Sequence, residues 1–224
     1  MAIFLTGGGE QEVFQSLDKV FLNSLPAHSK VAILPHASDD HQEVLERIED
    51  YFSHKNVSKF ELVITPSESL LDYDAIMIEG GNTFDLIREV RDSAFFDLLL
   101  AFHKSGKTIY ADSAGAIVLG SDVHTAFLGD DGDEDQLKLQ DYRGLDIIHP
   151  WCLHAHATSA EHDALQDLLY DQGNPILALA ENTGIKIDGD ELEVFGLDQL
   201  EVVTFSGRQL LAPREKASLT KLQE

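Results

Sequence analysis

The chain has 224 residues, of which 43% are hydrophobic, enough for one compact domain with a sizeable core and too many for a disordered chain. Its 40 acidic and 16 basic residues give a formal net charge of −24, which disfavours nucleic acids and anionic membranes as partners. The single cysteine, Cys152, excludes an intrachain disulfide, and the apolar run at residues 2–5 is too short for a signal peptide or a membrane span, so we expect a cytoplasmic protein. We interpret the acidic surface as a solvated one; adaptation to high salt is the alternative.

The first half of the chain alternates short apolar segments with amphipathic ones. Strands are expected at residues 2–6, 30–35, 60–64, 75–78 and 108–111. Apolar residues at helical spacing predict helices at residues 11–25, at 40–54, and from 83 to 100 with a break near 92–93. Alternating strands and helices predict an α/β fold, in which helices cover both faces of a mostly parallel sheet in three αβα layers.

The second half of the chain has a different pattern. Residues 129–135 form an acidic run, interpreted as a solvated loop because its glycine spacing does not match a calcium-binding loop. A helix is expected at residues 159–170, followed by strands at 175–179, 184–187, 192–195 and 201–205 that form antiparallel hairpins at one edge of the sheet. We therefore predict a single domain over residues 1–212 and a charged C-terminal tail over 213–224.

Ser113 lies between an expected strand and an apolar, helix-compatible run, in the sequence Ala-Asp-Ser-Ala-Gly at residues 111–115. A serine at a sharp strand-to-helix turn is typical of a nucleophile elbow, which lifts the hydroxyl above the sheet edge. A serine that merely caps the following helix is the alternative. The glycines at residues 7–9 and the polar loop at 80–83 also follow strands, and ligands bind at the carboxyl ends of parallel strands.

A nucleophilic serine needs a base, and four histidines follow the elbow: His149, His154, His156 and His162. One of them can serve Ser113. Alternatively, His154 and His156 flank a single residue and can face the same way on a strand, as metal ligands do. The chain has no His-Glu-x-x-His pattern that would favour a zinc enzyme.

Two motifs together resemble a known family: Gly-Gly-Asn-Thr-Phe at residues 80–84 and Ser-Ala-Gly-Ala at 113–116, followed downstream by a histidine and by Glu-Asn-Thr at 181–183. This combination resembles the peptidase E (aspartyl dipeptidase) and cyanophycinase family over nearly the whole chain. The resemblance implies a serine peptidase with a class I glutamine amidotransferase-like fold, acting on small peptides or amides. It implies no cofactor and no metal.

The resemblance also implies a role for each matching residue. Ser113 is the expected nucleophile, His156 the base with His154 as second choice, and Glu181 the acid that orients the base. The main-chain N–H groups of Gly81 and Ala114 form the expected oxyanion hole. The expected substrate-binding residues are Gly80, Asn82, Thr83, Asp112 and His154.

The chain departs from the family pattern at two places. Asp112 places a carboxylate directly before the nucleophile, where it can disfavour acidic substrates or touch the base. The arginine that binds the aspartyl side chain in aspartyl dipeptidases has no counterpart in residues 158–163. Strict specificity for Asp-X dipeptides is therefore not expected. A non-catalytic, amidotransferase-like binding or regulatory protein and a histidine-cluster metal hydrolase are the alternatives, and a homodimer is compatible with the sequence.

Overall fold

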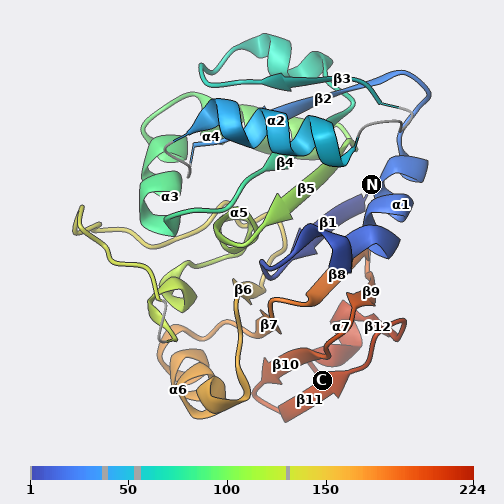
Figure 1. The fold of residues 1–224 in the computed structure, drawn as a ribbon. Coiled ribbons are helices and arrows are strands. Elements are labelled where there is room, and N and C mark those ends of the chain that lie inside the picture. The colour runs from blue at the N-terminus through green and yellow to red at the C-terminus, as the bar shows by residue number, and fades with distance from the viewer. Residues whose placement is uncertain (1, 37–39, 53–56, 130–131) are drawn as a thin grey trace.

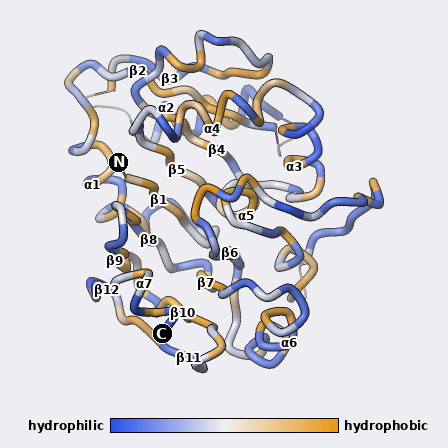
Figure 2. Tube along the Cα trace, turned by 180° about the vertical axis from the view of Figure 1, so that it is seen from behind, coloured by the Kyte–Doolittle hydropathy of each residue, from blue (hydrophilic) through white to orange (hydrophobic). Residues whose placement is uncertain are grey.

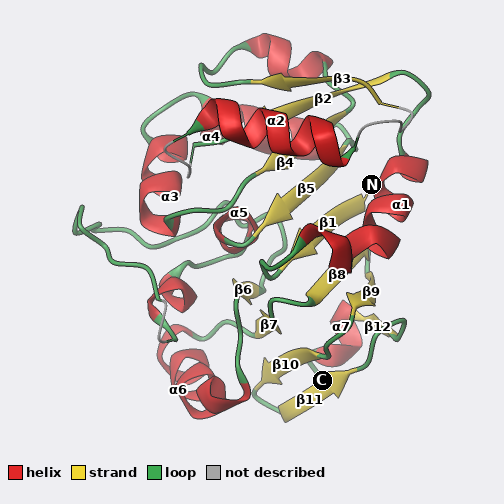
Figure 3. Ribbon diagram, in the orientation of Figure 1, coloured by secondary structure: helices red, strands yellow, loops and turns green. Residues whose placement is uncertain are grey.

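The computed structural model describes residues 2–36, 40–52, 57–129 and 132–224, and its described strands form two sheets (Figures 1 and 3). The larger sheet has eight strands in the order β12 (Lys216–Ser218), β9 (Glu191–Gly196), β8 (Thr183–Asp188), β1 (Ala2–Thr6), β5 (Thr108–Asp112), β4 (Ala75–Ile78), β2 (Ser29–Leu34) and β3 (Val57–Leu62). The smaller sheet has four strands in the order β11 (Gly207–Leu211), β10 (Leu200–Thr204), β7 (Ile176–Leu179) and β6 (Cys152–His154).

The centre of the larger sheet is parallel. The strand pairs β1–β5, β5–β4, β4–β2 and β2–β3 are parallel, whereas β8, β9 and β12 add antiparallel strands beside β1. All residues of β1 and β4 are buried, as expected for strands covered on both faces. This arrangement confirms the predicted α/β fold with a mostly parallel sheet and antiparallel C-terminal strands.

One face of the larger sheet is covered by α1 (Gln15–Ser24) and α2 (His41–Tyr51). A short 3₁₀ turn, η1 (Gln11–Phe14), leads into α1, and the Asp40 side chain caps α2 by accepting hydrogen bonds from the N–H groups of Gln42 and Glu43. Phe21 of α1 packs edge-on against Phe4 of β1, with ring centroids 5.5 Å apart.

The opposite face is covered by α3 (Thr83–Arg91), α4 (Phe95–Lys104) and α5 (Ala114–Leu119), with the 3₁₀ turn η2 (Glu68–Asp72) packed beside α4. The predicted break is present, since α3 ends at Arg91 and α4 begins at Phe95. Within the break, the Ser93 hydroxyl accepts a hydrogen bond from the Phe95 N–H group. All six residues of α5 are buried.

The smaller sheet packs on the same side of the larger sheet as α5, and its apolar residues join that core. Its other face is covered by α6 (His162–Gln172), which follows the 3₁₀ turn η4 (Ser159–Glu161). Residues expected as two of the edge hairpin strands, 175–179 and 201–205, therefore belong to a separate sheet, in which β6 and β7 are parallel. Strand pairing between distant segments is not visible in the periodicity of either segment.

Residues 213–224, expected as a charged tail, contain β12 and α7 (Leu219–Leu222) in the structure. Strand β12 pairs with β9, and Leu222 is buried against the main core. This charged segment therefore lies at the edge of the larger sheet and is anchored by strand pairing and by one buried leucine.

Apolar residues are concentrated in the strands and inner helix faces (Figure 2). Residues 132–142, in the connection after η3 (His124–Phe127), project away from the body of the molecule and are largely hydrophilic (Figures 1 and 2). In the described part of the chain, none of the helices combines the length and the apolar character needed to cross a membrane.

Candidate active site

Ser113 joins β5 to α5 in a strained backbone conformation, with φ 48° and ψ −115°. Such a conformation costs a non-glycine residue about 1–3 kcal/mol and persists only where its surroundings enforce it. Here the Ser113 N–H group donates to the Thr6 carbonyl oxygen at 3.0 Å, and a Cβ atom on Gly115 would lie 2.3 Å from the Ile78 carbonyl oxygen. The sharp strand-to-helix turn has the geometry of a nucleophile elbow.

His156 lies just beyond β6 and contacts Ser113 directly. Its Nε2 atom is 2.8 Å from the Ser113 Oγ atom. The turn after β1 fixes the ring: the His156 N–H group donates to the Gly7 carbonyl oxygen at 3.0 Å, and a Cβ atom on Gly8 would lie 2.2 Å from the ring Cε1 atom. Gly8 is therefore required by the close approach of the histidine, whereas a Cβ atom on Gly7 or Gly9 would meet the backbone of residues 179–181.

Glu181 lies in the short connection between β7 and β8. Its Oε1 atom is 3.3 Å from Nδ1 of His156, on the side of the ring opposite to Ser113. Both side chains are partly exposed, His156 by 47% and Glu181 by 64%. The three side chains form one hydrogen-bonded chain in the order serine, histidine, glutamate, which is the arrangement of a catalytic triad.

The loop after β4 lies beside the serine. Gly81 has a φ of 143°, and it lines the space around Ser113 together with Gly80. Asn82 was expected to bind substrate, but its Oδ1 atom caps α3 by accepting from the Phe84 and Asp85 N–H groups, and Asn82 is not among the residues that line the cavities beside Ser113. Ala114 is the first residue of α5, so its N–H group has no acceptor within that helix.

The other histidines of the sequence cluster have separate partners. His154 is buried, with Nδ1 3.2 Å from the Thr125 carbonyl oxygen and Nε2 3.2 Å from Glu161 Oε2. Burial lowers the pKa of His154, although Glu161 opposes this shift. His149 pairs with Asp146, and His162 pairs with Glu201. Within the described residues, no three His, Cys, Asp or Glu side chains are grouped so that they could hold a metal ion.

Two cavities meet at the serine. The larger, of about 790 Å³, extends toward the smaller sheet, and the other, of about 520 Å³, extends toward α2. Gly81, Ser113 and His156 line both. Among the expected binding residues, Thr83 and His154 line the larger cavity, and Gly80 and Asp112 line the smaller one. A substrate that spans both cavities would place the bond between its two parts at Ser113.

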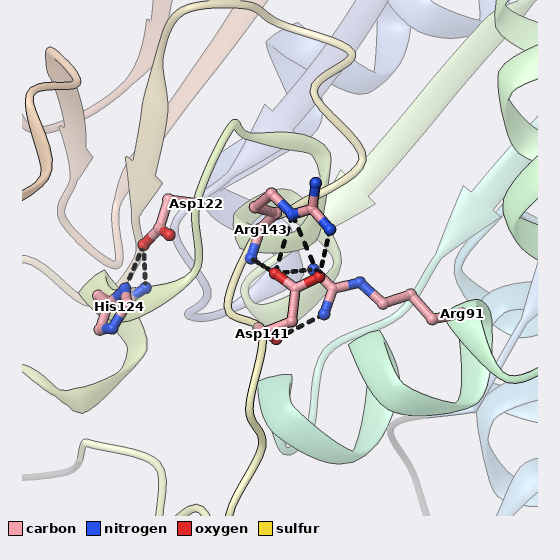
Figure 4. A network of polar contacts seen from close by, with 5 residues as sticks. All are labelled: Arg91, Asp122, His124, Asp141 and Arg143. Carbon is pink, nitrogen blue, oxygen red and sulfur yellow. Dashed lines mark hydrogen bonds and ion pairs between the residues drawn. The ribbon is translucent and has the colours of Figure 1, made fainter.

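The wall of the larger cavity includes η3 and the loop after it. Asp133, in the acidic run, accepts a hydrogen bond from the Thr83 N–H group at 2.8 Å, so this part of the run is not simply solvated; Asp130 and Asp131 lie outside the described residues. The far end of the loop is held by Asp141, which lies between Arg91 and Arg143, close to the Asp122–His124 pair (Figure 4). Hydrogen bonds from Arg143 hold the pKa of Asp141 below its usual range.

The smaller cavity is lined by charged side chains, among which Glu79 is buried, Asp112 is half-buried and Arg47 is exposed. Glu79 forms an ion pair with Arg47 of α2, and Asp112 accepts a hydrogen bond from the Thr6 hydroxyl. Burial raises the pKa of both carboxyl groups, only partly offset by Arg47 for Glu79 and by the Thr6 hydrogen bond for Asp112. Arg47 is the only lysine or arginine among the described residues that line either cavity.

Sequence reasoning did not identify Arg47, Glu79 or Glu161 as part of the site. Glu79 had a usable signal, because it directly follows a buried strand at the same sheet edge as Ser113. Arg47 is one of several charged residues on an amphipathic helix, and only the packing of α2 on the sheet distinguishes it.

Comparisons with known proteins identify the family of this chain. The sequence profile of peptidase family S51 matches residues 3–195. Curated proteins named peptidase E are similar in sequence: the one from Shewanella denitrificans is 25% identical over 66% of this chain, and the one from Streptomyces coelicolor is 22% identical over 89%. The alignments cover 64% and 83% of the lengths of these two relatives, so the chain spans less than two thirds of the Shewanella protein.

Solved structures show the same fold. A peptidase from an acI-B1 actinobacterium superposes with a TM-score of 0.71 at 18% identity, covering 97% of this chain and 96% of the other. A Listeria monocytogenes EGD-e protein that carries the peptidase E name superposes with a TM-score of 0.66 at 21% identity, covering 88% of this chain and 98% of the other. These likenesses show the fold alone.

Proposed function

The chain belongs to peptidase family S51, and from this premise we propose that it is a serine peptidase that hydrolyses small peptides or amides. Ser113 is the nucleophile, His156 the general base and Glu181 the acid that orients the base. The observation that carries the proposal is the chain of contacts from Ser113 Oγ to His156 Nε2 at 2.8 Å, and from His156 Nδ1 to Glu181 at 3.3 Å, where two cavities meet.

The reaction follows from the order of these contacts. His156 Nε2 accepts the proton of Ser113 as the Oγ atom attacks the scissile carbonyl carbon. His156 then donates that proton to the leaving amine, and an acyl-enzyme on Ser113 remains. A water molecule, deprotonated by His156, hydrolyses the acyl-enzyme. Glu181 holds the imidazole in position and stabilises its charged form between these steps.

The negative oxygen of the tetrahedral intermediate needs hydrogen-bond donors close to the nucleophile. We assign this role to the main-chain N–H groups of Gly81 and Ala114. Gly81 lines both cavities with Ser113, and Ala114 directly follows the nucleophile. Gly80, in the same loop, lies against the Ser113 side chain and so keeps the loop close to the nucleophile.

The charges that line the larger cavity favour a short substrate without acidic side chains. Asp133, Glu161 and Glu181 line the larger cavity, and its described lining contains no lysine or arginine. An aspartyl side chain would therefore find carboxylates rather than a cation there. This favours an exopeptidase or dipeptidase whose substrates are not restricted to Asp-X.

The test is hydrolysis of a dipeptide library by the wild type and by Ser113→Ala, with Ser105→Ala as the matched serine control far from the site. We expect Ser113→Ala to lose turnover by about 10⁴-fold or more while its thermal unfolding stays close to that of the wild type. A fluorophosphonate probe should label the wild type and the control, but not Ser113→Ala. Undiminished hydrolysis by Ser113→Ala would refute the proposal, and an inert wild type would favour a binding or regulatory protein.

Partners and location belong to the same proposal. The charge of −24 opposes binding to nucleic acid, and a single cysteine suits the reducing cytoplasm. Assembly as a homodimer is checked by light scattering, which would give twice the chain mass of 24.8 kDa. Activity that survives treatment with a chelator would dismiss the metal-hydrolase alternative.

A further inference from the structure

Asp112 is an expected site residue that takes no part in the triad. It ends β5 directly before the nucleophile and lines the smaller cavity. Its Oδ1 atom accepts a hydrogen bond from the Thr6 hydroxyl, and the Gly8 N–H group also donates to the carboxylate. These contacts fix the side chain, and neither of them supplies a positive charge.

The second carboxylate oxygen of Asp112 borders the same space as the nucleophile. A Cβ atom placed on Gly80 would lie 3.1 Å from the Ser113 Cβ atom and 3.3 Å from Asp112 Oδ2. Gly80 therefore packs closely against both Ser113 and Asp112, as glycine allows. Ser113 and Asp112 line the same cavity beside it, so one small group bound there can lie near both.

The charges of the smaller cavity are unbalanced. Arg47 forms its ion pair with Glu79, not with Asp112, and Glu43 adds another carboxylate to the described lining. Burial raises the pKa of both carboxyl groups, and the charge of Asp112 raises the pKa of Glu79 further. His156 and Arg47 offset only part of the shift at Asp112. A cation that entered beside the half-buried Asp112 would relieve the repulsion between the two carboxylates, and partial burial makes this interaction stronger than in bulk water.

We propose that Asp112 binds a protonated primary amine of the substrate next to the scissile carbonyl group. This inference rests on the proposed function, because it deepens the same site. The α-amine of an N-terminal residue lies only two bonds from the carbonyl carbon, so it suits a carboxylate that lines the same cavity as Ser113. A lysine side chain is the other source of the same chemistry. Asp112 is thus a specificity residue.

The experiment compares matched p-nitroanilides: leucyl, the des-amino analogue 4-methylpentanoyl, N-acetyl-norleucyl and N-acetyl-lysyl. The leucyl substrate tests the α-amine, and the N-acetyl-lysyl substrate tests the side-chain amine. We expect the wild type to prefer an amine-bearing substrate over its amine-free partner by about 10- to 100-fold in kcat/KM, a typical effect of a charge-assisted hydrogen bond. In Asp112→Asn, which keeps the shape and an acceptor for Thr6, this ratio should fall to about 1.

Asp198→Asn is the matched control, because Asp198 lines the larger cavity instead. The ratio should persist in this variant, and an equal fall would refute a specific role for Asp112. A wild type that hydrolyses amine-bearing and amine-free substrates equally well would also overturn the inference, even if Asp112→Asn did not fold. Fluorophosphonate labelling of the wild type distinguishes failure of the proposed function from failure of this inference. No labelling would mean that the proposed function fails. Labelling without a preference for amine-bearing substrates would mean that only this inference fails.

Discussion

Arg47→Met tests the charge balance beneath the nucleophile. The side chain of Glu79 is 8% exposed, whereas that of Arg47 is 45% exposed, so the substitution leaves a buried carboxylate without its counter-charge. An unpaired buried charge costs several kcal/mol when it cannot be neutralised, but part of this pair is solvated. We therefore expect the free energy of unfolding to fall by about 1–3 kcal/mol at pH 8.

The loss should depend on pH in a defined direction. Burial already raises the folded-state pKa of Glu79 above its ordinary value of 4.5, so the folded protein holds this proton to higher pH than the unfolded chain does. Such a carboxyl group lowers the free energy of unfolding as the pH rises from its pKa in the unfolded chain to its pKa in the folded protein. Removing Arg47 raises that pKa further, at about 1.4 kcal/mol per unit. The deficit of the variant should therefore be small near pH 5 and full at pH 8.

The assay is urea unfolding followed by the fluorescence of Trp151, the single tryptophan, which is buried. Arg143→Met is the control, because this arginine pairs with Asp141 while its own side chain is 81% exposed. Its effect should stay below about 1 kcal/mol and change little between pH 5 and pH 8. Adding Glu79→Gln to Arg47→Met should restore part of the stability. A deficit that is equal at both pH values, or no larger than that of the control, would refute the reasoning.

Three further outcomes are expected. Gly115→Ala should lose about 1–3 kcal/mol in denaturant unfolding and most of its activity, since the new Cβ atom would lie 2.3 Å from the Ile78 carbonyl oxygen; full activity would contradict this. Cys152 should resist iodoacetamide in the folded protein and react only on unfolding, because it is buried and burial raises its pKa to about 12; rapid labelling, read by mass spectrometry, would count against it. Leu222→Ala should lower the unfolding free energy by about 1–3 kcal/mol, whereas Leu197→Ala, at a side chain that is 70% exposed, should change little; equal effects would mean that the last helix is not docked.

Much of the fold could be predicted from local patterns. Buried parallel strands carry continuous apolar runs, so β1, β4 and β5 were found almost to the residue, and the mostly parallel α/β fold is confirmed. Strand β3 lies at residues 57–62 rather than 60–64, at the sheet edge where burial on one side gives a weaker pattern. The division of the C-terminal strands between two sheets depends on long-range pairing that no single segment encodes.

The site was predictable where the chemistry lies on short motifs. The elbow sequence and the resemblance to the family identified Ser113, His156 and Glu181, and the structure places these side chains in contact; their roles stay a proposal. Glu79 and Arg47 are 32 positions apart, and their pairing depends on how α2 rests on the sheet. Asn82 was assigned to substrate from the motif, whereas the geometry uses it to begin a helix.

The origin of the triad residues has a mechanical consequence. Ser113 extends from the larger sheet, whereas His156 follows β6 and Glu181 follows β7, neighbouring parallel strands of the smaller sheet. Gly7, which follows β1 of the larger sheet, ties the two parts together by accepting a hydrogen bond from the His156 N–H group. The distance between nucleophile and base is therefore a measure of how the two sheets are aligned. Substitutions in the core between the sheets should therefore change the rate of the proposed hydrolysis without altering any residue of the proposed substrate site.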